Sequence, residues 1–497
     1  MSASIIYRSL RTSLLKLEGV QPAFGLVSKV FFFAFIAATL ILFEEIDGRV
    51  NWSYSALHIL IIGISLLHIM WVRRYNLGAS YSLFTLIFFG AIPLFEYKLG
   101  ITYNSANIPR DSSYFAAAEL VLLTSVCFYL GYGLRRGASQ KVDELKKIRF
   151  LSTRHRQIIM WLTFGALFVC ALSIAAFYEF SLRNILFRGY GEELDQSAMG
   201  NAFITYFARP LFFNLVLIMV LAAAKERPVP RLWIFALFMS ALLFVSPVGI
   251  PRNLVGALYI PLLMMGFMPR TYTKYGVICV ILFAMLLAAP LVDVFRHINV
   301  HDEVDLGENY SLDYLFSGHF DAFHNLTQVI DLDYRSEGWQ VIGILLFWVP
   351  RALWEGKPVG TSFDFADYAG YQAHNISFPL PAEWYVDYGI LGVAFGMFFV
   401  GILYRRLDIL FSKPKEEGSI ASYISAIGRI ELSILGLFLL RGSVLATFAY
   451  TVGLGATLIF MSVIERAVRG QCAKHLLPKG GIKTNDAAAQ SLSQRLT

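Results

Sequence analysis

The stretch VIGILLFWVPRALWEGKPVG, residues 341–360, decides how many times the chain crosses a membrane. Its first nine residues are apolar, Pro350 interrupts them, and Arg351, Glu355 and Lys357 follow within seven residues. A transmembrane helix needs about 20 apolar residues to cross a hydrocarbon core of about 30 Å, so this run is too short to span. We predict a short re-entrant or interfacial helix that stops at Pro350.

The rest of the chain is rich in longer apolar runs. Of 497 residues, 57% are hydrophobic and 15% are charged, and the mean hydropathy is +0.58, which is too apolar for a soluble protein. The sequence therefore predicts an all-α polytopic membrane protein with about twelve transmembrane helices. We expect them near residues 26–43, 54–72, 77–95, 114–134, 157–178, 202–224, 231–246, 253–268, 275–294, 387–404, 420–440 and 443–464.

The positive charges give the orientation. Lys and Arg follow every even-numbered predicted span, as at 73–74, 135–156 and 405–406, and such residues mark the cytoplasmic side. Both termini are therefore predicted to be cytoplasmic. If residues 341–349 also crossed the membrane, Arg405 and Arg406 would fall outside, against this pattern. Because the net charge of +7 is explained by these cytoplasmic edges, it does not indicate a nucleic-acid partner.

Four regions follow from this topology. Residues 1–294 hold the first nine spans, 295–386 form one large external loop, 387–464 hold the last three spans, and 465–497 form a cytoplasmic tail that we expect to be partly disordered. The loop carries thirteen Asp and Glu against four Arg and Lys, so it does not follow the positive cytoplasmic pattern.

Several arginines and one lysine are expected on the external side, where the topology predicts few positive charges. They comprise Arg209 two turns inside the sixth span, Arg252 in SPVGIPRN, Arg296, Arg351, Lys357 and Arg441 in LLRGS. A charge at the membrane edge is a functional hypothesis by default. Arginine binds phosphate oxygens through two donors at once, so these residues suit a phosphate carried on a lipid. Snorkelling to headgroups or structural ion pairing stays open for each of them.

The external loop also contains acids and histidines. SGHFDAFHN places His319, Asp321 and His324 close together, and Glu383 lies beside Trp384 in PLPAEWYVDYG. The histidines lack helical i, i+4 spacing and a clear third ligand, so no metal site is predicted. No P-loop, HExxH or GxSxG motif occurs, so nucleotide-dependent chemistry and serine hydrolysis lose their usual support, and no cofactor is expected.

The order of SPVGIPRNLVGALYIPLL, FWVPRALWEGKPVG, PLPAEWYVDYGILGVAFGMFFVG and LLRGS resembles the O-antigen polymerases, the Wzy-type oligosaccharide repeat-unit polymerases of bacterial envelopes. The resemblance extends from about residue 200 onward. It implies a GT-C-like membrane glycosyltransferase that acts on the periplasmic face of the inner membrane. The donor would be a polyprenyl-pyrophosphate-linked oligosaccharide, and the acceptor would be the terminal sugar hydroxyl of another lipid-linked repeat unit. A chain-length regulator protein is a candidate partner, and neither nucleotide nor metal is expected.

Roles for individual residues follow as hypotheses. Arg351 and Lys357 would hold the pyrophosphate, because fixed cations stabilise charge that develops on a departing phosphate. Glu383 is the first candidate for the general base and Glu355 the second, although Glu355 could instead pair with Arg351 four residues earlier on a short helix. The residues expected to contact substrate are Arg252, Arg441, Arg209, Arg296, Trp354, His319 and Asp321.

Three other functions remain open. A ligase would move glycan from the same lipid carrier to a different acceptor. A flippase or transporter for lipid-linked sugar would carry charges in the middle of several spans, and Arg429 and Glu431 do lie deep in the eleventh predicted span. A membrane acyltransferase would need a histidine inside a span, for which His58 and His68 are the candidates.

Overall fold

The structure is a computed structural model, and every element that it describes is a helix. It describes residues 26–72, 75–103, 108–134, 153–187, 198–226, 231–267, 274–288, 318–336, 338–347, 349, 353–374, 376–412 and 420–476. Within these ranges there is no strand. The predicted all-α class is therefore confirmed, and the expectation for the tail beyond residue 476 falls outside the described residues.

The N-terminal part consists of long helices. After Leu26–Glu45 come α2 (Trp52–Trp71), the rod made by α3 (Leu77–Phe84), the π-helical segment η1 (Thr85–Ala91) and α4 (Ile92–Leu99), and then α5 (Asp111–Gly133). Asn51 and Asn76 start α2 and the rod, because their side chains accept hydrogen bonds from backbone N–H groups of the first turn. Most of the rod is buried within the bundle.

The middle of the chain supplies shorter elements. They are α6 (Thr153–Phe177), α7 (Leu182–Leu186), α8 (Ala198–Phe203), η2 (Ile204–Ala208), α9 (Arg209–Glu226), α10 (Arg231–Phe244), α11 (Arg252–Phe267), α12 (Lys274–Phe283) and η3 (Ala284–Ala288). α9 packs against α6, α10, α18 and α19, so this group joins the C-terminal helices.

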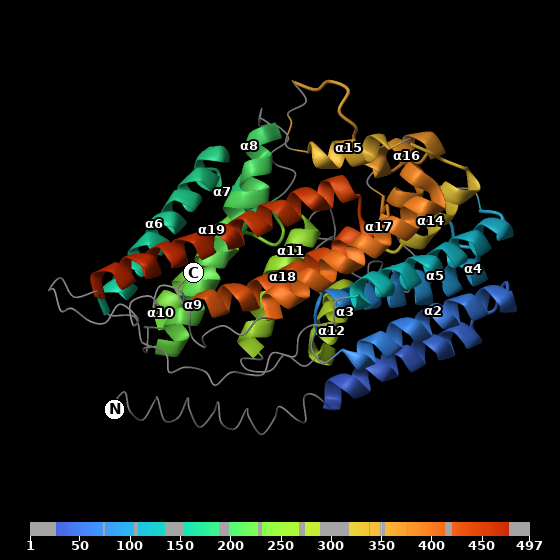
Figure 1. Cartoon of the computed structure of the whole chain (residues 1–497), viewed down its shortest axis with the longest axis horizontal. Coiled ribbons are helices and arrows are strands. Elements are labelled where there is room, and N and C mark those ends of the chain that lie inside the picture. Colours follow the sequence, from blue (N-terminus) through green and yellow to red (C-terminus); the bar gives the residue numbers. More distant parts are fainter. Residues whose placement is uncertain are drawn as a thin grey trace, which may run out of the picture.

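The C-terminal part begins with three short helices, α14 (Ala322–Asp331), α15 (Trp339–Leu345) and α16 (Thr361–Ala369). Three long ones follow, α17 (Leu380–Ser412), α18 (Ile420–Arg441) and α19 (Val444–Leu476). Figure 1 shows α14, α15 and α16 gathered at the end of the bundle where α17 begins. The external loop predicted from sequence thus contains compact helices at one end of the molecule.

Close packing of α17 on α5 fixes the position of this end. A Cβ atom added to Gly131 would lie 2.0 Å from the carbonyl oxygen of Phe398, and one added to Gly401 would lie 2.2 Å from that of Phe128. Only glycine allows two helix backbones to approach so closely, as is common between membrane helices. The two glycines therefore allow the second part of α17 to pack directly on α5.

Each of the twelve predicted spans overlaps a helix of the structure. Six helices are long and apolar enough to cross a membrane, consistent with an all-α membrane protein. They are Leu26–Glu45, Trp52–Trp71, Leu77–Leu99, Asp111–Gly133, Leu380–Phe411 and Thr447–Ile464. Other apolar helices are shorter, among them Trp161–Phe177 and Ile204–Val220. The number twelve, the orientation and the division at residues 294, 386 and 464 stay predictions.

The stretch 341–349 forms a helix too short to span, as predicted, but the predicted end of this helix is wrong. α15 covers seven residues and ends at Leu345, before Pro350. After it, the N–H groups of Phe347 and Val349 bind the carbonyl groups of Ile344 and Leu346, three residues back, which is the pattern of turns and not of an α-helix. The carbonyl groups of Phe347 and Val349 accept hydrogen bonds from Nζ of Lys357, at 2.7 and 2.8 Å. Lys357 therefore holds the chain that leaves this helix.

Candidate functional site

Arg441 and Asp321 lie 120 residues apart in the sequence and meet at the end of the bundle that carries α14, α15 and α16. Arg441 is the last residue of α18, and its Nη2 lies 4.0 Å from Oδ1 of Asp321. The same guanidinium donates hydrogen bonds to the backbone carbonyl groups of His319 at 3.0 Å and Gly318 at 3.3 Å. The predicted substrate-binding residues His319, Asp321 and Arg441 thus form one group.

Asp321 is held from its other side by the segment that precedes α17. Its Oδ2 accepts hydrogen bonds from Nδ2 of Asn325 at 2.9 Å and from the backbone N–H of Ser377 at 3.4 Å. The side chain is 1% exposed, whereas that of Arg441 is 24% exposed. Burial raises the pKa of Asp321, and the positive charge of Arg441 opposes this shift.

More polar side chains surround Asp321. Glu96 at the end of α4 and Tyr371 after α16 both lie close enough to interact electrostatically with it. Tyr103 donates a hydrogen bond of 3.0 Å to Oε1 of Glu96, and its ring packs edge-on against that of His324. We call this group the Asp321 cluster; it comprises Glu96, Tyr103, Asp321, His324, Asn325, Tyr371 and Arg441.

Several polar atoms in the Asp321 cluster are buried without a hydrogen-bond partner among the described residues. They are Oε2 of Glu96, Oδ1 of Asp321, Nδ1 of His324, Oδ1 of Asn325 and the hydroxyl of Tyr371. Buried polar atoms are normally satisfied, so such a concentration is typical of a site that receives water or a polar ligand. Burial also lowers the pKa of His324 to about 4, which keeps its imidazole neutral.

Glu383 occupies a second position nearby, in the first turn of α17. Its carboxylate accepts a hydrogen bond from the hydroxyl of Thr361, the first residue of α16, and one of 3.0 Å from the backbone N–H of Val444, the first residue of α19. Glu383 is 4% exposed. The carboxylate is favourably placed at the start of α19, because backbone N–H groups at a helix N-terminus lack partners within the helix.

The turn from Arg441 to Val444 therefore connects the two carboxylates. Its first residue contacts Asp321 through the guanidinium, and its last residue donates its N–H to Glu383. A Cβ atom added to Gly360 would lie 2.8 Å from Oγ of Ser443, so the GKPVG segment also packs on this turn. Three of the sequence elements singled out above converge here.

Other acids lie on the Glu383 side. Asp387 accepts a hydrogen bond from the hydroxyl of Ser336, and Oδ2 of Asp364 accepts one of 2.5 Å from Nε2 of Gln340. These acids and Glu383 are close enough to Tyr334 to help raise its pKa to about 12, although burial is the larger cause. This side of the site is consequently acidic, whereas Arg441 supplies a cation on the other.

The segment between α15 and α16 carries Trp354, Glu355 and Lys357. The ammonium of Lys357 binds backbone carbonyl groups, as described above, and Glu355 is exposed in a turn. The indole ring of Trp354 lies 6.5 Å from that of Trp339 on α15. The described residues 353–356 form a turn and not a helix, so the expected helical spacing of Glu355 from Arg351 is not found in this part. Arg351 itself, like Arg296, lies outside the described residues.

Arg209, predicted two turns inside the sixth span as a residue that contacts substrate, is buried among the helices. It is 1% exposed, and it donates hydrogen bonds to the carbonyl groups of Gly249 at 3.0 Å and Ile185 at 3.2 Å, with the guanidinium over the ring of Tyr178. It thereby ties α7 and the turn before α11 to α9. Arg252 begins α11 directly after that turn, but its side chain is not among the described ones.

Sequence reasoning missed Glu96, Tyr103, Asn325 and Tyr371. Glu96 ends an apolar run and looks like an interfacial charge, and nothing in the sequence pairs it with residue 321. Among the described residues, no three or more His, Cys, Asp or Glu side chains are arranged to hold a metal ion. The arrangement brings together a partly exposed guanidinium, two buried carboxylates and several hydroxyl groups, which can bind an anion and accept a proton.

Comparisons with known proteins leave this geometry as the main guide to function. No protein-family model, no curated protein and no solved structure matches the chain.

Proposed function

We propose that the protein is a membrane glycosyltransferase that polymerises polyprenyl-pyrophosphate-linked oligosaccharide repeat units into a surface polysaccharide on the periplasmic face of the bacterial inner membrane. The observation that carries the proposal is the turn Arg441–Val444, which places one guanidinium and two buried carboxylates at the end of a bundle of apolar helices. The resemblance of the sequence elements that meet there to the O-antigen polymerases points the same way.

In the proposed reaction, cations stabilise the pyrophosphate that leaves the donor sugar. Arg441 takes this role together with Arg351 and Lys357, and Arg252 and Arg296 belong to the surrounding positive groups. Arg209 acts only by positioning, because its buried guanidinium binds the carbonyl groups of Gly249 and Ile185. Lys357 acts in part by positioning the chain, because its ammonium binds two carbonyl groups. Trp354 and His319 are proposed to contact the glycan.

The acceptor hydroxyl needs a proton acceptor within hydrogen-bond reach. Glu383 is one candidate, but both of its oxygens already accept hydrogen bonds from helix termini. Oδ1 of Asp321 accepts none among the described residues, so it is the more available acceptor. Burial raises the pKa of both carboxyls, that of Glu383 to about 7, so the pKa shift does not distinguish them. A pyrophosphate that draws Arg441 toward itself would free Oδ1 of Asp321 for the acceptor. Glu355 remains the more exposed alternative.

One observation favours a flippase as the second candidate. In the interior of the bundle, Oε2 of Glu431 on α18 accepts a hydrogen bond of 3.4 Å from Nδ2 of Asn214 on α9, and both residues are fully buried. A carboxyl group inside membrane helices is typical of transport pathways. A ligase shares the proposed chemistry and differs only in the acceptor.

The test is complementation of a strain that lacks the gene, read as a polysaccharide gel. We expect Arg441→Ala to leave a single repeat unit and no ladder, whereas Arg110→Ala keeps the ladder. Arg110 is the matched control, because it also pairs with an aspartate, Asp331, but is 70% exposed. Full ladders from Arg441→Ala at normal expression would contradict the proposal. Loss of all attached sugar in the deletion strain would favour a flippase or ligase.

A further inference from the structure

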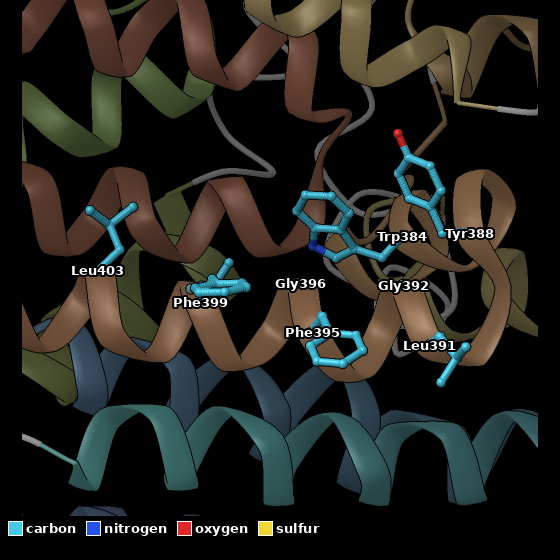
Figure 2. A pocket seen from close by; sticks show the side chains of 9 residues that line it. Trp384, Tyr388, Leu391, Gly392, Phe395, Gly396, Phe399 and Leu403 are labelled. Atoms are coloured by element: carbon cyan, nitrogen blue, oxygen red, sulfur yellow. The ribbon is translucent and has the colours of Figure 1, made fainter.

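An open apolar groove of about 430 Å³ runs along α17, starting at Trp384, the residue that follows Glu383 in the sequence. Trp384, Tyr388, Leu391, Phe395, Phe399 and Leu403 line it, and Figure 2 shows Leu391, Phe395, Phe399 and Leu403 along one helix, with Trp384 and Tyr388 near one end of this row. From residue 391 to residue 403 the helix rises about 18 Å, at about 1.5 Å per residue. The groove is therefore long and narrow, and a chain fits it better than a compact headgroup.

A backbone reversal builds the groove. Gly389 has φ 64° and ψ −155°, so the short helix Leu380–Tyr388 folds back on the spanning part of α17. A Cβ atom added to Gly396 would lie 2.5 Å from the indole ring of Trp384, and one added to Gly392 would lie 2.5 Å from the Trp384 carbonyl oxygen. These two glycines let Trp384 rest on the helix backbone, where it forms the wall of the groove nearest the site.

The surroundings of the groove are apolar along its length and polar at one end. Phe395 and Phe399 are 63% and 62% exposed on a helix apolar enough to span a membrane, so their neighbour is the lipid phase. At the polar end, Arg335 pairs with Asp333, stacks on the ring of Tyr385, the residue after Trp384, and donates a hydrogen bond of 2.9 Å to the carbonyl group of Tyr385. An occupant with an apolar chain in the groove and an anionic head that reaches Arg441, on the turn whose Val444 N–H binds Glu383, matches this arrangement.

We propose that this groove holds the isoprenoid chain of the lipid carrier and so places its phosphate end at the Arg441–Val444 turn. The inference rests on the proposed function, because that function requires a polyprenyl-linked donor. Glu383 and Trp384 are neighbours on the same short helix, so a chain in the groove has its head beside the site. A single groove suits a single-chain lipid better than a phospholipid, which has two chains.

The test is photocrosslinking of the full-length protein in vesicles of phosphatidylglycerol with a small fraction of labelled undecaprenyl phosphate. A benzoylphenylalanine replaces Phe399 in the groove or, as the matched control, Phe168 on α6, which is 68% exposed. We expect the probe at 399 to label undecaprenyl phosphate several-fold above its share of the lipid, and the probe at 168 to label it in proportion. Val400→Trp should reduce labelling from 399 several-fold, whereas Val169→Trp on α6 should not.

Three results would overturn the inference. They are proportional labelling from 399, labelling from 399 that Val400→Trp leaves unchanged, and a crosslink from 399 to a second copy of the chain in place of the lipid. The proposed function is judged separately, on the polysaccharide gel. A normal ladder without enriched labelling removes the groove assignment alone, and enriched labelling without any ladder removes the polymerase assignment alone.

Discussion

Asp321 and His324 lie three residues apart and respond to burial in opposite ways. Burial raises the pKa of the Asp321 carboxyl and lowers that of the His324 imidazole to about 4, so both groups favour their neutral forms. Arg441 is the charge that opposes this preference at Asp321. The ionisation of Asp321 is thus linked to whatever else binds the guanidinium, which is the property that the proposed mechanism uses.

His324 provides a prediction about pH. Its pKa is near 6.5 in an unfolded chain and about 4 in the folded protein, so the unfolded state binds the proton first as the pH falls. The stability that neutral His324 contributes is present above pH 6.5 and is lost between pH 6.5 and about 4. The raised pKa of Asp321 changes the stability in the opposite direction as the pH falls. The effect of His324 must therefore be measured by comparing the wild type with a variant that lacks only this histidine.

Thermal unfolding of the detergent-solubilised protein at several pH values makes that comparison. We expect the melting temperature of the wild type to fall more steeply between pH 6.5 and 4 than that of His324→Gln. Parallel curves for the two proteins would show that His324 does not titrate in this way.

At the scale of elements, the reversal at Gly389 determines both the site and the groove. Before the reversal, Glu383 contacts Thr361 at the start of α16 and Val444 at the start of α19. After the reversal, the second part of α17 packs on α5. A residue with a side chain is strained at φ 64° combined with ψ −155°, a region open almost only to glycine.

Gly389→Ala is therefore expected to destabilise the protein by about 1–3 kcal/mol, the usual cost of such a backbone conformation. Its added Cβ meets no atom within 4 Å, so the effect would come from the backbone and not from a clash. Gly165→Ala on α6 is the matched control, because it also meets no atom but lies in an ordinary helix, where alanine is favoured by about 0.5–1 kcal/mol. Equal thermal stability of the two variants would contradict the assigned role of Gly389.

For the whole molecule, the apolar runs predict the helices well. A helix that faces lipid and a helix buried in the bundle both need a long apolar stretch, so either environment leaves the same pattern in the sequence. The contacts at the site were less predictable. Arg441 and Asp321 are each visible as unusual residues, but their meeting depends on how α14 and α18 pack. Glu96 was missed for the same reason. Lys357 binds backbone carbonyl groups, which every residue has. The sequence therefore gives no sign of this contact, and the structural role of Lys357 could not be predicted.

The orientation can be tested on exposed residues at the two ends. We expect Cys in place of Asp333, before α15, to react with a membrane-impermeant maleimide in intact cells whose outer membrane is opened. Cys in place of Arg406, near the end of α17, should react only after the inner membrane is permeabilised. Both variants are made after Cys127, Cys170, Cys279 and Cys472 are replaced by Ser. The reverse pattern would invert the topology and place the candidate site in the cytoplasm.

The most direct measurement uses purified protein reconstituted in vesicles with polyprenyl-pyrophosphate-linked repeat units as the sole substrate. We predict that lipid-linked oligomers of increasing length form with release of polyprenyl pyrophosphate, and that Arg441→Ala and Asp321→Asn abolish both products while Arg110→Ala does not. Unchanged repeat units that only cross the bilayer, with no pyrophosphate released, would contradict the assignment of a glycosyltransferase.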